Sequence, residues 1–576
     1  MKNQNLRLSI FLSLLIYVFI PTYTVAKTLK ANVIFTRGGI AIELEERLKT
    51  SNQPDSLHPL PSLAIREATE PAEEISPSWI DDQRALATYD WIPQTNYHVT
   101  FRWTDGSLFA MDITAPPKPL PYRIRTVELE EPLSLLANLQ NPAKPTTIAF
   151  STDGAQLAVG TNAGHVAIIN PLTGDRIWKT RISEGYAKHA AFSPDGKRFY
   201  IGEQSADAFI YAYDLSTTKP TLLWKYRMAD DIDTSTPQNP DDVYAWVQYP
   251  GPYRISTTEA GDLLVVGNHS WTKEGVGLKK AKLYRFDGAT GAVKWKWPPG
   301  QSLPMTISWF DYSRDVKTVA LLVYKRGSGD TMSFKSGTLY VIDGETGGTA
   351  WEHTFDPLKP YFEEVTFWRG VSVAPDGRFI NVTADDGRAF IFNATLDPGG
   401  IKPLWETNLT TPLEVSSIPI IATNGTIGAT NDFALFVTGD TFIPYHLQKG
   451  AQQPPSAHPN GMTLFAHRWS GEKAWQWTLE NMPQGLQVDG TGRYAIISVS
   501  KRGRNIQKQF HGVSVFDLTA EGGGLSKYLY TYRTEGQLPY DTIDISTNGQ
   551  FIALIEAPIT MPDETVRGRN RVHIIR

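Results

Sequence analysis

The segment Asp287-Gly-Ala-Thr-Gly-Ala-Val-Lys-Trp295 is one copy of a repeated pattern, which returns at Asp343-Gly-Glu-Thr-Gly-Gly-Thr-Ala-Trp351. A third copy runs from Asn170 to Trp178, with asparagine in place of the first aspartate. The Thr-Gly pair is typical of a tight turn, since glycine adopts the positive φ that other residues avoid. Alternating apolar segments flank each copy, so each turn joins two β-strands. The recurrence indicates a repeat protein.

The sequence around these turns contains eight units of about four short strands each. A second kind of turn joins the first two strands of a unit, as at Asp153-Gly154 and Asp195-Gly196. One such sheet cannot bury both of its faces alone, whereas sheets arranged radially stack on their neighbours. The sequence therefore predicts an all-β fold with an eight-bladed β-propeller over 122–576. Seven blades is the alternative, because a long insertion stretches the sixth unit.

The eighth unit ends after its third strand, because the chain ends at Arg576. The segment 122–129 alternates correctly to supply the missing fourth strand. We expect this pairing to close the ring and hide the exposed sheet edges.

Residues 1–26 are predicted to be a signal peptide. Lys2 and Arg7 precede the apolar run 8–20, and Thr24-Val25-Ala26 suits cleavage before Lys27. The run is shorter than the roughly 20 residues that a membrane span needs, and an uncleaved anchor is the alternative. We expect an exported protein, periplasmic or extracellular, soluble or peripheral and monomeric. Its mature chain would have no transmembrane segment.

Residues 27–116 are predicted to form a small β-sandwich. Strand-like segments lie at 32–35, 40–44, 97–103 and 108–113, and a long loop is expected over 51–78. The run Trp91-Ile-Pro-Gln-Thr-Asn-Tyr97 resembles the tyrosine corner of fibronectin type III or immunoglobulin-like domains. Residues 117–121 make a proline-rich linker to the propeller.

Composition excludes several classes of function. The chain has 576 residues, no cysteine and a formal net charge of −5. The lack of cysteine excludes disulfides, thiolate zinc sites, cysteine nucleophiles and c-type haem. The acidic balance removes the electrostatic case for a nucleic-acid partner. An anion-binding site must therefore be local.

The Asp-x-x-Thr-Gly-x-x-x-Trp pattern resembles the repeat of the pyrroloquinoline-quinone propeller superfamily, and the Ser-x-Asp-Gly turns are similar to those of WD-repeat propellers. The resemblance implies that each repeat tryptophan wedges between adjacent blades. These structural blade-docking residues are Trp178, Trp224, Trp295, Trp351, Trp405 and Trp475. The superfamily holds dehydrogenases as well as scaffolds, so the resemblance alone does not set the function.

The alternative function is a quinone-dependent dehydrogenase or a cofactor-binding propeller with its site in the central funnel. The resemblance implies a vicinal cysteine pair over such a cofactor, and this chain has no cysteine. We therefore expect no enzyme, no catalytic residue and no cofactor. Calcium is a weaker alternative at the acidic segment Asp230-Asp231-Ile-Asp233 with Asp241-Asp242, which lacks the glycine and terminal glutamate of a calcium loop.

Long loops are predicted on one side of the ring, between the second and third strands or between blades, at 229–252, 268–281, 325–337, 439–462, 501–512 and 556–570. They carry basic and aromatic residues, and function tends to lie on such loops. We expect an interaction scaffold that binds an acidic protein or an anionic polysaccharide there, although basic loops also keep β-edges soluble. The candidate residues are Lys279, Lys280, Lys325, Arg326, Lys501, Arg502, Arg504, Arg567, Arg569, Trp246, Tyr249 and Trp271.

Overall fold

The computed structural model divides into two compact units, Met1–Tyr122 with Ala520–Tyr532 and Arg123–Thr519 with Arg533–Arg576. The structure describes residues 14–16, 27–29, 31–36, 39–44, 62–67, 73–75, 78–79, 84–88, 95–102, 108–115, 124–129, 145–217, 219–237, 245–324, 336–395, 402–444, 447, 452–500, 511–540, 542–561 and 564–576.

The N-terminal unit contains two four-stranded antiparallel sheets, with the orders β10-β9-β5-β6 and β3-β4-β8-β7. Its strands are β1 Leu14–Ile16, β2 Lys27–Leu29, β3 Ala31–Thr36, β4 Gly39–Leu44, β5 Ser62–Glu67, β6 Glu73–Ile75, β7 Ser78–Trp79, β8 Arg84–Thr88, β9 Asn96–Arg102 and β10 Leu108–Thr114. Strands β1 and β2 pair with each other. The four strands expected from the sequence are present as β3, β4, β9 and β10. The signal peptide and the sandwich packing stay predictions.

The prediction of a long loop over 51–78 is wrong, because this stretch contains β5, β6 and the first residue of β7. Leu63 and Ile65 pair with Phe101 and Val99 of β9. A short apolar alternation therefore forms a strand within a segment whose overall composition is typical of a loop.

Among the described residues are eight radial sheets, which are the blades of a β-propeller; their strands belong to the second unit, apart from residues 528–532. Blades one to four comprise β12 Pro145–Phe150, β13 Leu157–Thr161, β14 His165–Ile169 and β15 Arg176–Arg181; β16 Tyr186–Phe192, β17 Arg198–Gln204, β18 Phe209–Asp214 and β19 Thr221–Arg227; β20 Gly251–Thr257, β21 Leu263–Lys273, β22 Val276–Phe286 and β23 Val293–Trp297; and β24 Thr306–Tyr312, β25 Thr318–Tyr324, β26 Gly337–Asp343 and β27 Thr349–Phe355.

Blades five to eight comprise β28 Val371–Val373, β29 Phe379–Thr383, β30 Arg388–Asn393 and β31 Trp405–Asn408; β32 Leu413–Val415, β33 Ile418–Ala429, β34 Ala434–Phe442, β35 Thr463–His467 and β36 Lys473–Thr478; β37 Pro483–Val488, β38 Tyr494–Val499, β39 His511–Asp517 and β40 Tyr528–Thr534; and β41 Ile543–Ile545, β42 Ile552–Glu556, β45 Arg571–Ile575 and β11 Ile124–Glu128. The remaining elements are α1 Ala229–Ile232, η1 Ala245–Gln248, α2 Gly524–Lys527, β43 Ile559–Thr560 and β44 Val566–Arg567. Among the described residues, no helix is both long and apolar enough to cross a membrane.

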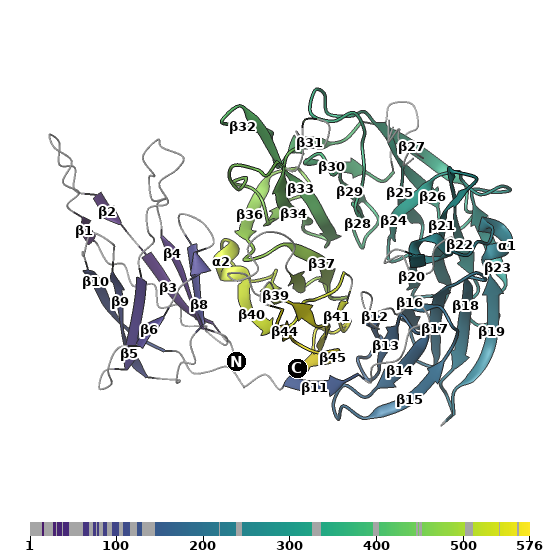
Figure 1. Ribbon diagram of the computed structural model, residues 1–576, viewed down its shortest axis with the longest axis horizontal. Helices are drawn as coiled ribbons and strands as arrows, with labels where there is room; N and C mark the ends of the chain where they lie inside the picture. The colour runs from purple at the N-terminus through teal and green to yellow at the C-terminus, as the bar shows by residue number, and fades with distance from the viewer. Residues whose placement is uncertain are drawn as a thin grey trace. The chain divides into compact units, whose positions relative to one another are not determined.

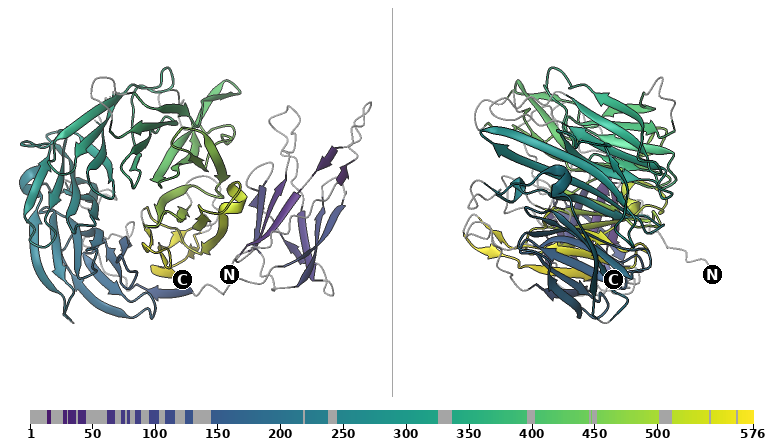
Figure 2. Two further views of the ribbon diagram at one scale, coloured as in Figure 1. Left: turned by 180° about the vertical axis from the view of Figure 1, so that it is seen from behind. Right: turned by 90° about the vertical axis from the view of Figure 1, so that its right-hand side faces the viewer.

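In every blade except six and eight, chain order matches position from the centre outward; blade six begins with the extra strand β32, and the outermost strand of blade eight is β11. Figure 1 shows the first strands, such as β12, β16 and β20, around the centre of the ring, and fourth strands such as β19 at its rim. The reverse view in Figure 2 shows the same order. Because successive strands are antiparallel, the connections alternate between two faces. We call the face that carries the second-to-third and blade-to-blade connections the insertion face, and the opposite one the turn face.

The hairpin of blade three differs from the sequence prediction. Residues 268–281 were expected to be a loop, but β21 and β22 pair continuously from Leu263 opposite Phe286 to Lys273 opposite Val276. Glu274 and Gly275 connect them with φ values of 52° and 77°. Two positive φ values are typical of the type I′ turn, whose twist matches a hairpin. The insertion is therefore an extension of the blade itself.

The first strand of the second unit, β11, closes the ring. It pairs antiparallel with β45 at the end of the chain, with Ile124 opposite Ile575 and Glu128 opposite Arg571. Val127 packs against a buried cluster that includes Ile148 of blade one and Val572 of blade eight. The two ends of the propeller thus share one sheet.

Each repeat tryptophan lies in the fourth strand of its blade or at that strand's start, and it contacts the following blade. The indole nitrogens of Trp224, Trp295 and Trp351 donate to the carbonyl oxygens of Gly288, Gly344 and Ala394, over 3.1, 2.8 and 3.0 Å. The rings of Trp178, Trp405 and Trp475 lie 5.0, 4.6 and 6.4 Å from those of Tyr213, His467 and Phe516. These contacts join six successive pairs of blades.

The turn glycine of the next blade receives the tryptophan. A Cβ atom on Gly291, Gly347 or Gly471 would lie 2.6, 2.7 or 2.1 Å from the indole of the preceding blade. At the ring closure, Arg125 of β11 takes the place of the tryptophan. Its Cδ lies 2.9 Å from the Cβ position of Gly174, and its Nη1 donates to the Thr173 carbonyl over 2.6 Å.

The change Gly347→Ala tests this contact, with Gly300→Ala as the matched control. Both glycines have φ near 75–80°, but nothing lies within 4 Å of a Cβ on Gly300. Both variants lose about 1 kcal/mol to the positive φ. Overpacking against Trp295 costs Gly347→Ala roughly 1–3 kcal/mol more, measured by chemical denaturation. Equal losses would contradict the wedge.

The change Val127→Asp tests the closure, with Thr126→Asp as its control on the exposed side of the same strand. A carboxylate in the interblade core is expected to lower the unfolding free energy by about 2 kcal/mol or more, whereas Thr126→Asp changes it little. Thermal unfolding and light scattering measure the difference. Two variants with the same melting temperature would argue against closure through β11.

Candidate functional site

The innermost strands of five blades carry an extra residue at a similar level. The pairing register shifts at Thr146, His189, Tyr253, Ser308 and Gln484, each near the start of its strand. Such bulges bend a strand and re-aim its side chains. His189 has a φ of 56°, which non-glycine residues seldom adopt. These strands start at the insertion face, so the irregular segments lie toward that face.

Three cationic side chains lie against aromatic rings at this level. Lys188 Nζ lies 4.2 Å from the centre of the Tyr253 ring. The guanidinium carbons of Arg254 and Arg369 lie 4.7 and 4.9 Å from the centre of the Trp309 ring. Arg369 also lies 5.3 Å from the ring of Trp368. We call Lys188, Tyr253, Arg254, Trp309, Trp368 and Arg369 the inner cluster.

The inner cluster is surrounded by protein but is still reached by solvent. Lys188, Arg254 and Arg369 are half-buried, and Trp368 is 46% exposed. A ring face stabilises a nearby cation most when water is partly excluded. The rings therefore compensate part of the cost of holding three positive charges together.

The pKa values reflect burial first and the crowding of positive charge second. Burial, followed by repulsion from Arg369, lowers the pKa of Lys188 to about 7. Burial lowers the pKa of Arg369 to about 9, where the Tyr540 hydroxyl opposes the shift and Arg254 adds to it. Burial and the three cations hold the pKa of His189 well below its usual value. A bound anion would favour the charged forms of Lys188, His189 and Arg369, which burial and mutual repulsion disfavour.

Asp311 supplies negative charge beside the cluster. Its Oδ1 lies 3.2 Å from Arg254 Nη2, while its Oδ2 accepts hydrogen bonds from Ser372 Oγ and the Val373 amide over 2.8 and 2.9 Å. This carboxylate links the first strands of blades three, four and five. It fixes Arg254 in place.

Asp385 holds the loop that presents Trp368 and Arg369. Its carboxylate accepts hydrogen bonds from Thr366 Oγ1, over 2.6 Å, and from the Trp368 amide. The same loop reaches a distant blade, because the Trp368 ring lies 5.3 Å from that of Tyr540. Tyr540 precedes blade eight and Trp368 precedes blade five. The two connections therefore meet on the insertion face.

Four of the predicted partner-binding positions belong to one region of blade three. Lys279 and Lys280 lie in β22, and Lys280 Nζ pairs with Asp233 Oδ2 at 2.8 Å. Trp271, in β21, stacks on His269 with ring centres 3.9 Å apart. The Tyr249 carbonyl accepts a hydrogen bond from Gln204 Nε2 over 3.2 Å, and Gln204 Oε1 accepts one from Lys188 over 3.1 Å. Gln204 thus connects this region to the inner cluster.

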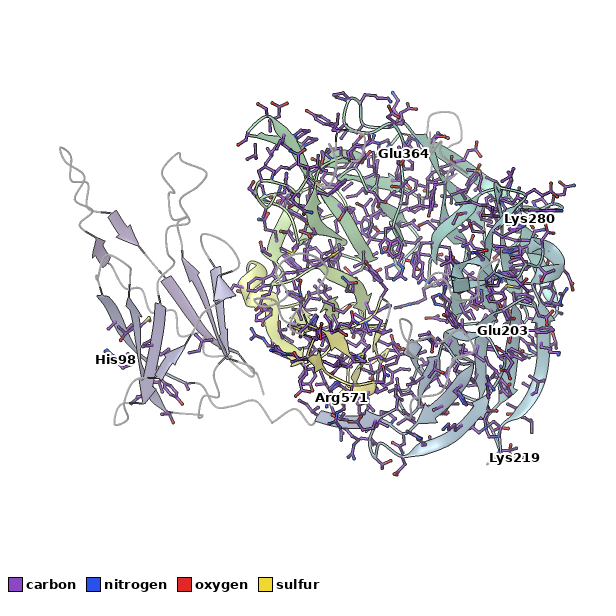
Figure 3. The ribbon with its side chains drawn as sticks, viewed as in Figure 1. His98, Glu203, Lys219, Lys280, Glu364 and Arg571 are labelled. Carbon is purple, nitrogen blue, oxygen red and sulfur yellow. The ribbon has the colours of Figure 1, made fainter. Side chains whose placement is uncertain are left out.

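The other predicted positions are apart from that region or outside the described residues. Arg567 and Arg569 are exposed in the insertion of blade eight, whose β45 carries Arg571. Figure 3 labels Arg571 and Lys280 at well-separated places in the ring. Lys325, Arg326, Lys501, Arg502 and Arg504 lie outside the described residues, as does the side chain of Trp246.

The acidic segment considered for calcium is occupied by cations. Asp230 pairs with Arg227, and Asp231 with Lys296 at 2.8 Å. Asp233 pairs with Lys280, as described above. Asp230 and Asp231 lie in α1, which differs from the expected loop. Asp241 and Asp242 lie outside the described residues. These ion pairs compete with any metal for the carboxylates.

The inner cluster was not predicted from the sequence. The pattern that could have indicated it is an aromatic residue or a histidine next to a cationic residue near the start of a repeat, as in Lys188-His189, Tyr253-Arg254 and Trp368-Arg369. The first repeat has the apolar run Ile148-Ala-Phe150 in the corresponding strand. The sequence shows charged residues in the first strands of several repeats. It does not show which of these residues lie close together, because that depends on the closure of the ring.

The geometry defines an eight-bladed β-propeller with a cationic and aromatic cluster at its inner strands. Residues 134–297 match a family model described as outer membrane protein assembly factor BamB. No curated protein matches this chain.

Three solved structures resemble the chain at low similarity. They are the Cps50 (Swd1) β-propeller domain of Myceliophteria thermophila, the Dos1 propeller, and Chaetomium thermophilum Sqt1 bound to the N-terminus of ribosomal protein L10. Their identities are 12, 11 and 11%, with TM-scores of 0.38, 0.38 and 0.44. The matches cover 78, 83 and 75% of this chain and 99, 88 and 96% of those chains. At these TM-scores they carry no functional argument.

Asp544, in the innermost strand of blade eight, gives a pH-dependent prediction. Burial raises its pKa to about 7, although the Phe150 amide donates to its Oδ2 over 2.7 Å. Between about pH 4 and pH 7 the Asp544 carboxyl group is protonated in the folded state and ionised in the unfolded state. The free energy of unfolding therefore falls as the pH rises through this range. Asp544→Asn is expected to be more stable than the wild type at pH 8, by on the order of 1 kcal/mol. The advantage should shrink at pH 4, and an equal difference at both pH values would contradict the shift.

Proposed function

We propose that this protein is an exported, non-catalytic binding propeller that takes an acidic protein partner on its insertion face. The inner cluster carries the proposal, because its cations crowd together and the pKa values of Lys188 and Arg369 are depressed by burial and by neighbouring positive charge. Negative charge brought by a partner would relieve this repulsion.

The placement of the insertions supports the same face. The β21–β22 hairpin, the connection that contains α1 and η1, and the insertion with β43 and β44 all lie between second and third strands or between blades. Val276 and Val566, at the tips of two of these elements, are 53% and 64% exposed. Exposed apolar residues beside a cationic site suit a protein interface, which combines apolar contacts with charge complementarity.

Export is proposed from residues 1–26, which have the charge, apolar run and small residues of a signal peptide. The match of residues 134–297 to an outer membrane protein assembly factor agrees with a binding role in a cell envelope. We also propose that the two N-terminal sheets pack as an immunoglobulin-like sandwich. An anionic polysaccharide is the alternative partner.

Site-specific photocrosslinking in the source cells tests the face. A crosslinking amino acid replaces Val276 or Val566 on the insertion face, or Leu172 in a turn-face connection of blade one. Leu172 is a matched control, because it is apolar and 49% exposed. We expect the same protein adduct from Val276 and Val566, lost at high salt, and none from Leu172. Adducts from Leu172 alone, or none from any position, would contradict the proposal.

A further inference from the structure

The cations of the inner cluster are packed against aromatic rings. Two guanidinium groups lie over the Trp309 ring, and the Lys188 ammonium lies over Tyr253. A guanidinium carries five N–H donors in its plane, so a carboxylate can accept hydrogen bonds from it while a ring supports the group. The rings therefore act as supports for the cations.

We propose that the inner cluster binds the carboxylates of glutamate or aspartate side chains in an acidic peptide segment. This inference rests on the proposed function and names its ligand chemistry. Arg369 and Lys188 are the main contacts, because both are half-buried and come from elements beside the insertion face. Arg254 assists while Asp311 holds it.

The arrangement favours a peptide carboxylate over an acidic sugar. Recognition of a sugar chain uses open aromatic faces, whereas Trp309 and Tyr253 already face cations. Trp368 is exposed, but its ring stands at 61° to that of Tyr540, so the two do not form one flat platform. Carboxylates need only the N–H donors, which Arg and Lys supply as charge-assisted hydrogen bonds.

We expect the peptide to enter from the insertion face, because contacts between blades occupy the turn-face end of the inner strands. On the turn face, Arg314 Nη2 of blade four donates to the Gly490 carbonyl of blade seven over 3.1 Å. Arg314 also pairs with Glu259 of blade three at 3.2 Å. A peptide segment that reaches Arg369 and Lys188 from the insertion face does not disturb these links.

Binding should be coupled to proton uptake by Lys188. The groups around its ammonium are Arg369, which repels it, Gln204, which accepts its hydrogen bond, and the Tyr253 ring, with His189 and Arg254 nearby. Its pKa of about 7 leaves it largely neutral at pH 8. A bound carboxylate favours the charged form, so binding at pH 8 takes up a proton and affinity falls above pH 7.

Isothermal titration calorimetry of the full chain with tetraglutamate tests the proposal, in two buffers of different ionisation enthalpy. Arg369→Gln is expected to weaken binding about tenfold or more, and Arg369→Lys less. Lys188→Gln should remove the proton uptake seen at pH 8. The matched control is Arg468→Gln, because Arg468 lies over the ring of Phe433 at 4.5 Å but in a turn-face connection. It should bind like the wild type.

Titrations with three further ligands distinguish which class of anion the inner cluster binds. Glutarate tests a free dicarboxylate, trigalacturonate an acidic sugar, and inorganic phosphate a general anion site. Weaker binding of all three than of tetraglutamate supports a peptide ligand, and tighter binding of any one contradicts it. Tetraglutamate binding that is absent, or equal in wild type and Arg369→Gln, overturns the proposal. If crosslinks from Val276 and Val566 persist in that case, the proposed function stands and only its ligand chemistry fails.

Discussion

The structure depends on the contact between the repeat tryptophan of one blade and the following blade, where a turn glycine receives the indole in three cases, at Gly291, Gly347 and Gly471. A four-stranded sheet with two apolar faces is stable only between neighbours, so the blades must be joined into a ring. The indole fills the space that a glycine leaves open, as between Trp295 and Gly347. At the point where the chain's ends meet, Arg125 of β11 makes the equivalent contact with Gly174. One kind of interblade contact therefore serves both the repeats and the closure.

The inner cluster exists because the ring is closed. Its residues come from blades two, three and four and from the connection into blade five, and Trp368 meets Tyr540 before blade eight. Three cations this close would repel one another strongly in a sealed core. Here they are half-buried, backed by rings, and partly compensated by Asp311. The fold thus maintains a positive site that an acidic ligand can stabilise further.

The fold was largely predictable from the sequence, whereas the site was not. Turn residues such as Asp287 and Gly291 specify local geometry, so the repeats and their number follow from them. The β21–β22 hairpin was missed because its extension carries charged residues, and Glu274-Gly275 was not recognised as a turn. Lys188 and Arg369 lie 181 positions apart in the sequence, from 188 to 369, and only ring geometry brings them together. Lys280, one of the basic residues singled out instead, has an ion-pair partner of its own in Asp233.

A crystal structure of the full chain with bound tetraglutamate would test peptide binding at the inner cluster. We expect a closed eight-bladed ring, with a peptide carboxylate oxygen within about 3.2 Å of Lys188 Nζ or an Arg369 guanidinium nitrogen. The peptide should approach from the insertion face. A peptide bound on the turn face, or only at exposed arginines such as Arg567, would contradict the account.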